Sequence, residues 1–281
     1  MRIELIDKNC YMVTLSFPPF VTTSMVYVCQ DGDAVMVDGG CEDRTELLDY
    51  FTERGIRIKA AVCTHLHWDH VANIKHVLPG GGRVLAFRGE DTPYASRSDE
   101  DLSKVEFVDE GKLELFGKEF ELIPLPGHTP GQAAVVTPNG ICHVGDAILT
   151  KEVLLQAKLP FMTDTSQAIA SMEKLRGTSF ERYMAAHCGM ISEEELPGII
   201  DANIQKEIDI YKAMLAMVKA PVDIDEFVGI FLESLGISFS KTVRAQWLVT
   251  IKQRVKELVL AEELTMDGNY IMPAYKGSKT N

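Results

Sequence analysis

The sequence predicts an α/β fold that carries a helical extension at its C-terminal end. Over the first two-thirds of the chain, short apolar runs alternate with turns and amphipathic helices, which is typical of sheets covered by helices. Histidine and aspartate residues follow several of these apolar runs, where an α/β fold collects its functional groups. After about Ser192 the pattern changes to long helices and a final short hairpin.

A hairpin is predicted within the body, since the apolar runs 25–29 and 34–38 flank an Asp-Gly turn. Residues 42–56 show helical spacing and end at a glycine, which predicts an amphipathic helix. The apolar run 59–64 predicts a buried strand that leads directly into a histidine cluster. Further strands are predicted at 83–87, 119–125, 132–137, 141–145 and 182–187, and a helix at 165–177.

The C-terminal part is predicted to be mainly helical. A long helix starts near Pro197, and the segment 220–223, Ala-Pro-Val-Asp, separates a body, 1–219, from an extension, 220–281. The extension reads as two helices near 224–235 and 240–263, followed by two short strands about an Asp-Gly turn; this order is similar to a winged-helix module. One apolar face is predicted for the long helix (Ile200, Ile204, Ile208, Tyr211, Leu215) and one for the last helix (Val243, Trp247, Ile251, Val255, Leu258).

Composition narrows the class of protein. Of the 281 residues, 46% are hydrophobic and 25% are charged, as in ordinary globular enzymes. The net charge of −13 argues against a broad surface for nucleic acid or anionic membrane. There is no signal-peptide pattern and no apolar run of membrane-spanning length. The six cysteines are scattered without a C-x-x-C pair, so we expect a cytoplasmic protein with reduced thiols.

The stretch "CTHLHWDH", residues 63–70, points to a metal site. It places three histidines and an aspartate within six positions directly after a predicted strand. Isolated partners follow three later strands. The seven candidate ligands are His65, His67, Asp69, His70, His128, Asp146 and His187.

These motifs resemble those of the metallo-β-lactamase superfamily. The resemblance covers roughly residues 1–219 and rests on "VDGG", "THLHWDH", "PGHTPGQ", "GD" and "AAHCG", which occur in the family's order. It implies a four-layer αββα sandwich with a binuclear site at one edge of the two sheets. It further implies that His65, His67 and His128 bind one metal, that Asp69, His70 and His187 bind the second, and that Asp146 bridges the two.

The resemblance also implies a chemistry. Two divalent cations, zinc by default and otherwise iron or manganese, would activate a hydroxide held between them. Asp69 is expected to orient the nucleophile or to carry a proton to the leaving group, and Asp38 to orient a ligating imidazole. The expected reaction is hydrolysis of an ester-like bond in a small molecule, with a thioester or a lactone favoured.

The sequence leaves two other functions open. A phosphodiesterase or endoribonuclease would use the winged-helix-like extension to bind nucleic acid. However, residues 220–281 hold seven Lys/Arg and eight Asp/Glu, whereas nucleic-acid modules are normally basic. A solvent-exposed helix face is therefore predicted for Lys241, Arg244, Lys252, Arg254 and Lys256, and the extension is expected to cover the pocket or to pair subunits in a homodimer. A non-catalytic metal-binding protein is disfavoured because no ligand is missing.

Four residues are candidates for lining the substrate pocket: Phe17 and Phe20 from a turn-forming apolar segment, Trp68 between the ligands, and Phe161 beside Met162 in the loop after Asp146. The remaining histidines, His76 and His143, are interpreted as ordinary packing or surface residues. Cys188 is not expected to bind metal, because neighbouring side chains point in different directions.

Overall fold

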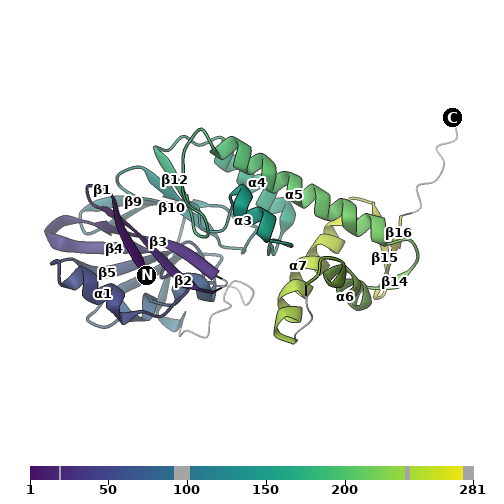
Figure 1. The fold of residues 1–281 in the computed structure, drawn as a ribbon, viewed down its shortest axis with the longest axis horizontal. Coiled ribbons are helices and arrows are strands. Elements are labelled where there is room, and N and C mark those ends of the chain that lie inside the picture. The colour runs from purple at the N-terminus through teal and green to yellow at the C-terminus, as the bar shows by residue number, and fades with distance from the viewer. Residues whose placement is uncertain (19, 92–101, 238–240, 275–281) are drawn as a thin grey trace.

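The computed structural model describes residues 1–18, 20–91, 102–237 and 241–274, without the side chains of Phe20, Leu102 and residues 241–246. Two sheets and their helices form a body, and a long helix connects it to a smaller C-terminal lobe (Figure 1). Within the described part of the chain, no helix is both long and apolar enough to cross a membrane.

The first sheet contains seven strands in sequence order. They are β1 (Arg2–Asp7), β2 (Cys10–Phe17), β3 (Phe20–Val28), β4 (Asp33–Val37), β5 (Arg57–Cys63), β6 (Arg83–Phe87) and β7 (Val105–Val108). Strands β1 to β4 pair antiparallel, and β4 to β7 pair parallel. The helices α1 (Thr45–Thr52) and α2 (Trp68–Val71) belong to this half, with 3₁₀ turns at Gln30–Gly32, Ile74–His76 and Leu102–Lys104.

The second sheet has six strands in the order β13-β12-β11-β10-β9-β8. These strands are β8 (Gly111–Leu115), β9 (Lys118–Pro124), β10 (Ala133–Val136), β11 (Ile141–His143), β12 (Arg182–Ala185) and β13 (Gly189–Ile191), and only β11 and β12 pair parallel. The helices of this half are α3 (Lys151–Gln156), α4 (Thr165–Arg176) and α5 (Leu196–Met217).

The alternation of side chains along the strands creates the layers. In β4, Ala34 and Met36 pack in the cluster that contains Leu47 and Phe51 of α1, while Val35 and Val37 pack between the two sheets. On the far face of the second sheet a third cluster joins its strands to α4 and α5. Successive strand residues point to opposite faces, so each central strand is buried on both sides. The predicted four-layer αββα arrangement is confirmed.

The C-terminal lobe consists of β14 (Val222–Asp223), α6 (Ile224–Ser234), α7 (Lys241–Leu260), β15 (Leu264–Asp267) and β16 (Tyr270–Pro273). The last strand pairs with both others, in the order β14-β16-β15. Phe227 and Phe231 of α6 pack against Ile251 and Val255 of α7 in a core that also includes the C-terminal end of α5. Of the predicted apolar stripe of α7, Ile251, Val255 and Leu258 are buried and Trp247 is partly buried, while the side chain of Val243 lies outside the described residues.

The buried face of α5 matches the predicted one only in part, since Ile200 is fully buried but Ile208 is not. Ile208 is 38% exposed, whereas Asn203 and Glu207 are buried together with Ile199, Ile210 and other apolar residues. The predicted face was built from apolar residues alone, and it missed the two polar residues that the fold satisfies internally. Asn203 bonds to both backbone groups of Leu149, and Glu207 pairs with Arg254.

Candidate metal centre

The seven candidate ligands lie where strands of both sheets end. His65, His67, Asp69 and His70 follow β5 of the first sheet, and the last two lie on α2. His128, Asp146 and His187 follow β9, β11 and β12 of the second sheet. Their donor atoms form three overlapping groups, each within 4.8 Å: His65–His67–His128, His65–His70–Asp146 and Asp69–His70–His187. The sandwich thus brings together, at one edge, residues from four strand ends.

The first group consists of three imidazoles that face one another. Nδ1 of His67 lies 3.1 Å from Nε2 of His65 and 2.9 Å from Nε2 of His128. The opposite nitrogen of His128, Nδ1, donates to the Phe161 carbonyl at 2.9 Å. That bond fixes the ring orientation and leaves the Nε2 lone pair directed at the other two histidines.

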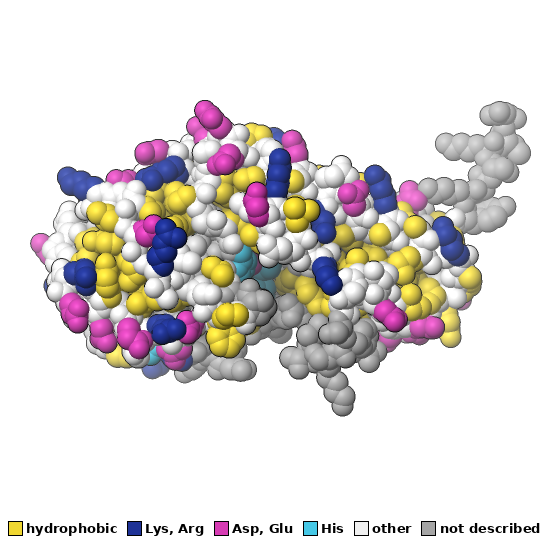
Figure 2. All heavy atoms as spheres, viewed as in Figure 1, with side chains coloured by type: hydrophobic (Ala, Val, Ile, Leu, Met, Phe, Trp, Pro, Cys, Tyr) yellow, Lys and Arg dark blue, Asp and Glu magenta, His cyan; other side chains and the backbone are white. Residues whose placement is uncertain are grey.

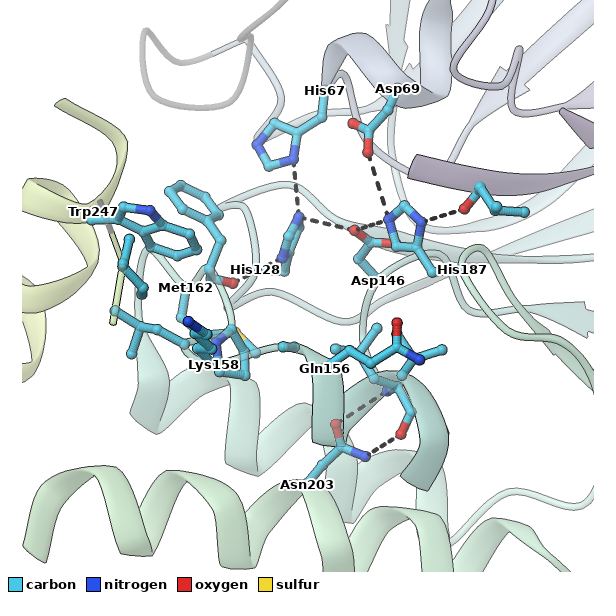
Figure 3. A pocket seen from close by; sticks show the side chains of 18 of the residues that line it. His67, Asp69, His128, Asp146, Gln156, Lys158, Met162, His187, Asn203 and Trp247 are labelled. Atoms are coloured by element: carbon cyan, nitrogen blue, oxygen red, sulfur yellow. Dashed lines mark hydrogen bonds and ion pairs between the residues drawn. The ribbon is translucent and has the colours of Figure 1, made fainter. Parts of the chain in front are cut away.

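The second group surrounds Asp146. Its carboxylate lies 3.1 Å from Nε2 of His187, 3.4 Å from Nε2 of His70 and 3.5 Å from Nε2 of His128. Asp69 approaches Nε2 of His187 from the other side, at 3.6 Å. His187 donates from Nδ1 to the Val21 carbonyl at 2.7 Å. We call His65, His67 and His128 the first triad, and Asp69, His70 and His187 the second triad. Asp146 therefore contacts histidines of both triads, whereas, among the candidate ligands, the contacts of His187 are with Asp146 and with its own triad (Figure 3).

These residues fit divalent metal ions. In a tetrahedral zinc site with bonds of 2.0–2.1 Å, neighbouring nitrogens are about 3.3 Å apart, close to the 3.1 and 2.9 Å separations among His65, His67 and His128. In addition, Nε2 of His70 and Oδ1 of Asp146 are buried 3.4 Å apart, and neither atom forms a hydrogen bond. Buried polar atoms are normally paired, and a cation would supply the partner.

Burial and charge act differently on the two triads. Burial and the neighbouring histidines lower the pKa of His65 well below its usual range, and burial also lowers the pKa of His128. Burial opposes the protonation of His187 too, but Asp146 outweighs it and raises the pKa to about 9. The same carboxylate, together with Asp38, raises the pKa of His70 despite burial. Negative charge is thus concentrated at the second triad.

Comparison with known proteins identifies the family. The sequence profile described as the Metallo-beta-lactamase superfamily matches residues 18–187, which is more than half of the chain. The chain belongs to the metallo-beta-lactamase superfamily. Family membership and the three histidine-containing groups together indicate a metal-dependent hydrolase.

The curated relatives match only part of this superfamily member. A hydroxyacylglutathione hydrolase from Photobacterium profundum is 30% identical over 144 residues, which is 50% of this chain and 52% of that protein. A probable metallo-hydrolase from Bacillus subtilis, YflN, is 26% identical over a stretch that covers 47% of this chain and 65% of the length of YflN. The chain therefore spans about half the length of the hydroxyacylglutathione hydrolases that it matches.

Solved structures match nearly the whole chain, including the C-terminal lobe. A metallo-beta-lactamase family protein from Thermus thermophilus has a TM-score of 0.74 at 16% identity, covering 96% of this chain and 100% of its own. A beta-lactamase domain protein from Burkholderia ambifaria has a TM-score of 0.70 at 15% identity, and the match covers 97% of this chain and 93% of that protein's chain. At this identity the likeness shows the fold alone.

Asp38 of the superfamily's "VDGG" segment is fully buried beside the ligands. Its carboxylate accepts from Nδ1 of His70 at 2.9 Å and from the Thr64 backbone and hydroxyl at 2.7 and 2.9 Å. The first bond directs Nε2 of His70 toward Asp146, as carboxylates behind metal-binding histidines do. Asp38 has a φ of 60°, a left-handed conformation that aspartate tolerates better than most residues.

Sequence reasoning missed Glu90. This carboxylate is 2% exposed and accepts from the Leu66 backbone at 2.9 Å, the Gly131 backbone at 3.1 Å and the Thr129 hydroxyl. It thereby joins the loop of His65 and His67 to the loop of His128. Burial raises its pKa, against these hydrogen bonds. Glu90 follows β6, so the same search for polar residues after strands would have found it.

Arg254 corrects the prediction of a solvent-exposed basic face on α7. It is fully buried and donates to Glu207 of α5 at 3.0 and 2.5 Å and to the Pro160 carbonyl at 3.3 Å. Thr250, one turn earlier, bonds to both backbone groups of Met162 at 3.3 and 3.1 Å. The Glu207 carboxylate on α5 supplies the counter-charge that allows Arg254 to be buried. Lys252 is half-buried and pairs with Asp225 on the surface, and the side chains of Lys241 and Arg244 lie outside the described residues.

These hydrogen bonds from α7 fix the position of the loop between α3 and α4. Pro160 and Met162 are fixed by α7, and the residue between them, Phe161, offers its carbonyl to His128. The C-terminal lobe is thus connected to a candidate metal ligand through one short segment of backbone.

The candidate pocket residues fall into three groups. Trp68, Phe161 and Met162 line a cavity that also includes His67 and Asp146. Phe17 does not line it; the ring is 54% exposed and lies edge-on to Trp68, with centroids 6.4 Å apart. The side chain of Phe20 lies outside the described residues.

His143, His76 and Cys188, which are not among the seven candidate ligands, have other partners. His143 is buried between the Thr23 carbonyl, 3.0 Å from Nε2, and the Gly145 backbone, 3.1 Å from Nδ1. His76 pairs with Asp43 near the surface at 2.5 Å. The sulfur of Cys188 accepts from the Thr150 backbone at 3.0 Å and belongs to none of the three candidate metal groups.

Proposed function

We propose that this protein is a binuclear metal-dependent hydrolase that cleaves an ester-like bond in a small molecule, with a thioester favoured over a lactone. The observation that carries the proposal is the pair of donor triads that share contacts with Asp146. The name of the hydroxyacylglutathione hydrolases among the relatives describes release of an acyl group from glutathione, which supports the choice of a thioester.

We assign the donors to two ions as the motifs predict. His65 and His128 would bind one ion through Nε2 and His67 through Nδ1, since these three nitrogens converge. Asp69, His70 and His187 would bind a second ion, and Asp146 would contact both. Bound divalent cations lower the pKa of water toward about 7 and polarise a carbonyl oxygen. Zinc is the first choice for this mixture of imidazole and carboxylate, with iron and manganese as alternatives.

The protein's own groups supply positioning and proton transfer. Asp69 lies at the cavity wall beside His187, where its carboxylate can accept a proton from the attacking water and pass it to the leaving group. Asp38, the Phe161 carbonyl and the Val21 carbonyl each hold one ligand ring in a fixed orientation. Such fixed orientation lowers the reorganisation required during the reaction.

A nuclease is the second candidate, and only the strand–helix–helix–hairpin order of the C-terminal lobe favours it. The structure argues against that role for α7. Thr250 and Arg254 bond to the loop before α4, Arg254 also bonds to Glu207 of α5, and Lys252 pairs with Asp225. Among the side chains of this helix that the structure describes, Lys256 is the one cation without such a bond, and one cation is too little for a phosphate-binding face.

Metal content and a substrate screen test the proposal together. Protein purified without chelator, or reconstituted with zinc, manganese or iron, should contain about two ions per chain. It should hydrolyse at least one member of a panel of thioesters, lactones and phosphodiesters. A content well below one ion after reconstitution would refute the binuclear site. Two bound ions with activity on phosphodiesters alone would favour the nuclease.

A further inference from the structure

The candidate metal centre opens into a cavity of about 680 Å³, a size that suits a small-molecule ligand. The metal donors form one end of it, and the loop between α3 and α4 leads from them toward α7 (Figure 3). The rest of the wall is largely apolar, and we define the apolar arm of the cavity by Val153, Leu159, Phe161, Met162, Ile237 and Trp247. The arm begins beside the donors, since the Phe161 ring lies 5.3 Å from the His67 ring and 5.4 Å from the His128 ring. Figure 2 shows the histidines in a hollow between the body and the C-terminal lobe, with hydrophobic side chains on the lobe side.

Charged groups are scarce in this cavity outside the donor cluster. Among the described lining residues, Lys158 is the one lysine or arginine, and its ammonium group donates to the Gly236 carbonyl at 2.7 Å. The amide of Asn203 is committed to the backbone of Leu149 and to the Ile199 carbonyl. Gln156 is solvent-exposed at the rim. A glutathione portion carries two carboxylates and an ammonium group, and this lining offers it little complementary charge.

We infer that the apolar arm binds the acyl chain of a thioester, so that the preferred substrates carry an apolar acyl group and not a glutathione conjugate of a hydroxy acid. This inference rests on the proposed function. Hydrolysis would break the C–S bond of the thioester and form a C–O bond with the oxygen of water. The products would be a carboxylate, a proton and a free thiol, so no oxidant or further reactant is needed.

The physical reason for the preference is burial. An acyl chain that leaves water for a wall of leucine, methionine and tryptophan gains free energy in proportion to its length. The gain continues until the chain reaches the end of the arm. Two wall residues, Ile237 and Trp247, come from the C-terminal lobe, so the length of chain that fits is set partly by that lobe.

A substrate series tests the inference on the metal-reconstituted protein. The probes are acetyl, butanoyl, hexanoyl and octanoyl thioesters of N-acetylcysteamine, with S-lactoylglutathione for comparison. The value of kcat/KM should rise about fourfold per methylene until the arm is filled, and the butanoyl thioester should exceed S-lactoylglutathione. A flat or falling series, or a preference for S-lactoylglutathione, would overturn the inference.

A matched pair of variants locates the effect. Trp247→Ala removes a wall of the arm and should lower kcat/KM for the octanoyl thioester by about tenfold, with little change for the acetyl thioester. The control is Leu155→Ala, since Leu155 is 84% exposed and does not line the cavity. It should leave the whole series unchanged. Equal losses for acetyl and octanoyl substrates in the Trp247 variant would contradict a role in binding the chain.

Ligand binding separates this inference from the proposed reaction. The chain contains two tryptophans, Trp68 and Trp247, and both line the cavity. In metal-loaded Trp68→Phe protein, the fluorescence of Trp247 should report octanoate binding at concentrations at least tenfold below those needed for acetate. If no thioester is hydrolysed but octanoate binds in this way, the proposed reaction is refuted, while the binding of an acyl chain in the apolar arm is supported. If octanoate binds no better than acetate, the arm is refuted whatever the reaction.

Discussion

Replacing Arg254 by methionine should destabilise the protein strongly, because it would leave a carboxylate buried without its cation. Arg254 is fully buried and Glu207 is 1% exposed, and two of the guanidinium nitrogens lie 3.0 and 2.5 Å from the same carboxylate oxygen. Removing one partner of a buried ion pair costs about 3–5 kcal/mol of unfolding free energy. Replacing both, as in Arg254→Met with Glu207→Leu, should restore most of that loss, since an apolar pair of similar volume avoids the buried charge.

The loss of unfolding free energy in the Arg254→Met variant should also depend on pH. Burial raises the pKa of Glu207, and Arg254 acts against that rise, so the pKa in the Arg254 variant should be higher still. A carboxyl group with a higher pKa in the folded than in the unfolded state favours folding at low pH. That advantage is lost as the pH rises through the folded-state pKa. The destabilisation by Arg254→Met should therefore be larger at pH 7 than at pH 5.

Urea unfolding of the wild type, the single variant and the double variant at both pH values measures these effects. Lys252→Met is the matched control on the same helix. Its ion pair with Asp225 is partly exposed, and such pairs contribute about 0–1 kcal/mol. If Arg254→Met cost no more than Lys252→Met, or if the double variant were as unstable as the single one, the reasoning about a buried charge would be wrong.

Three other predictions concern the centre and its surroundings. Glu90→Gln should weaken metal binding and lower the unfolding free energy by about 1–3 kcal/mol, because Gln cannot accept all the hydrogen bonds that join the two ligand loops. Metal titration and urea unfolding measure the two effects, and unchanged affinity and stability would count against that role. Asp146→Ala should deplete both metal positions, whereas His187→Ala should deplete chiefly one, as read from anomalous scattering; two full positions in the Asp146 variant would exclude a bridge. In a filter-binding titration near physiological salt, single-stranded RNA should not bind tightly, and tight binding that weakens steeply with added salt would favour a nuclease.

The layers of the body were predictable because each central strand is a continuous apolar run bounded by turns, as 34–38 and 59–64 show. The strands β1, β2, β7, β8, β13 and β14 were not predicted. For β13 and β14 the reason is length, since three and two residues are too few to show a period. The buried face of α5 was misplaced for a different reason. Asn203 and Glu207 are polar, and their burial depends on partners at Leu149 and Arg254 that only the tertiary structure brings near.

The grouping of the candidate ligands followed from motif order, because all seven come after strands that end at one edge of the sandwich. The cavity wall was harder to predict. Phe161 and Trp68 were candidates because they adjoin ligands, but Ile237 and Trp247 reach the same cavity only because the C-terminal lobe packs against the loop before α4. Nothing in the local pattern of α7 distinguishes a side chain that faces the cavity from one in the core of the lobe.

The division between donors and wall has a consequence for how this protein can change. All metal-ligand candidates lie between residues 65 and 187, whereas part of the wall comes from Ile237 and Trp247, which follow a 22-residue helix. Substitutions in the lobe can therefore reshape what the cavity accepts without altering any donor. Natural variation or directed evolution in these residues should diversify substrate choice while the chemistry is inherited intact. The limit is set by Thr250 and Arg254, which the loop beside His128 requires.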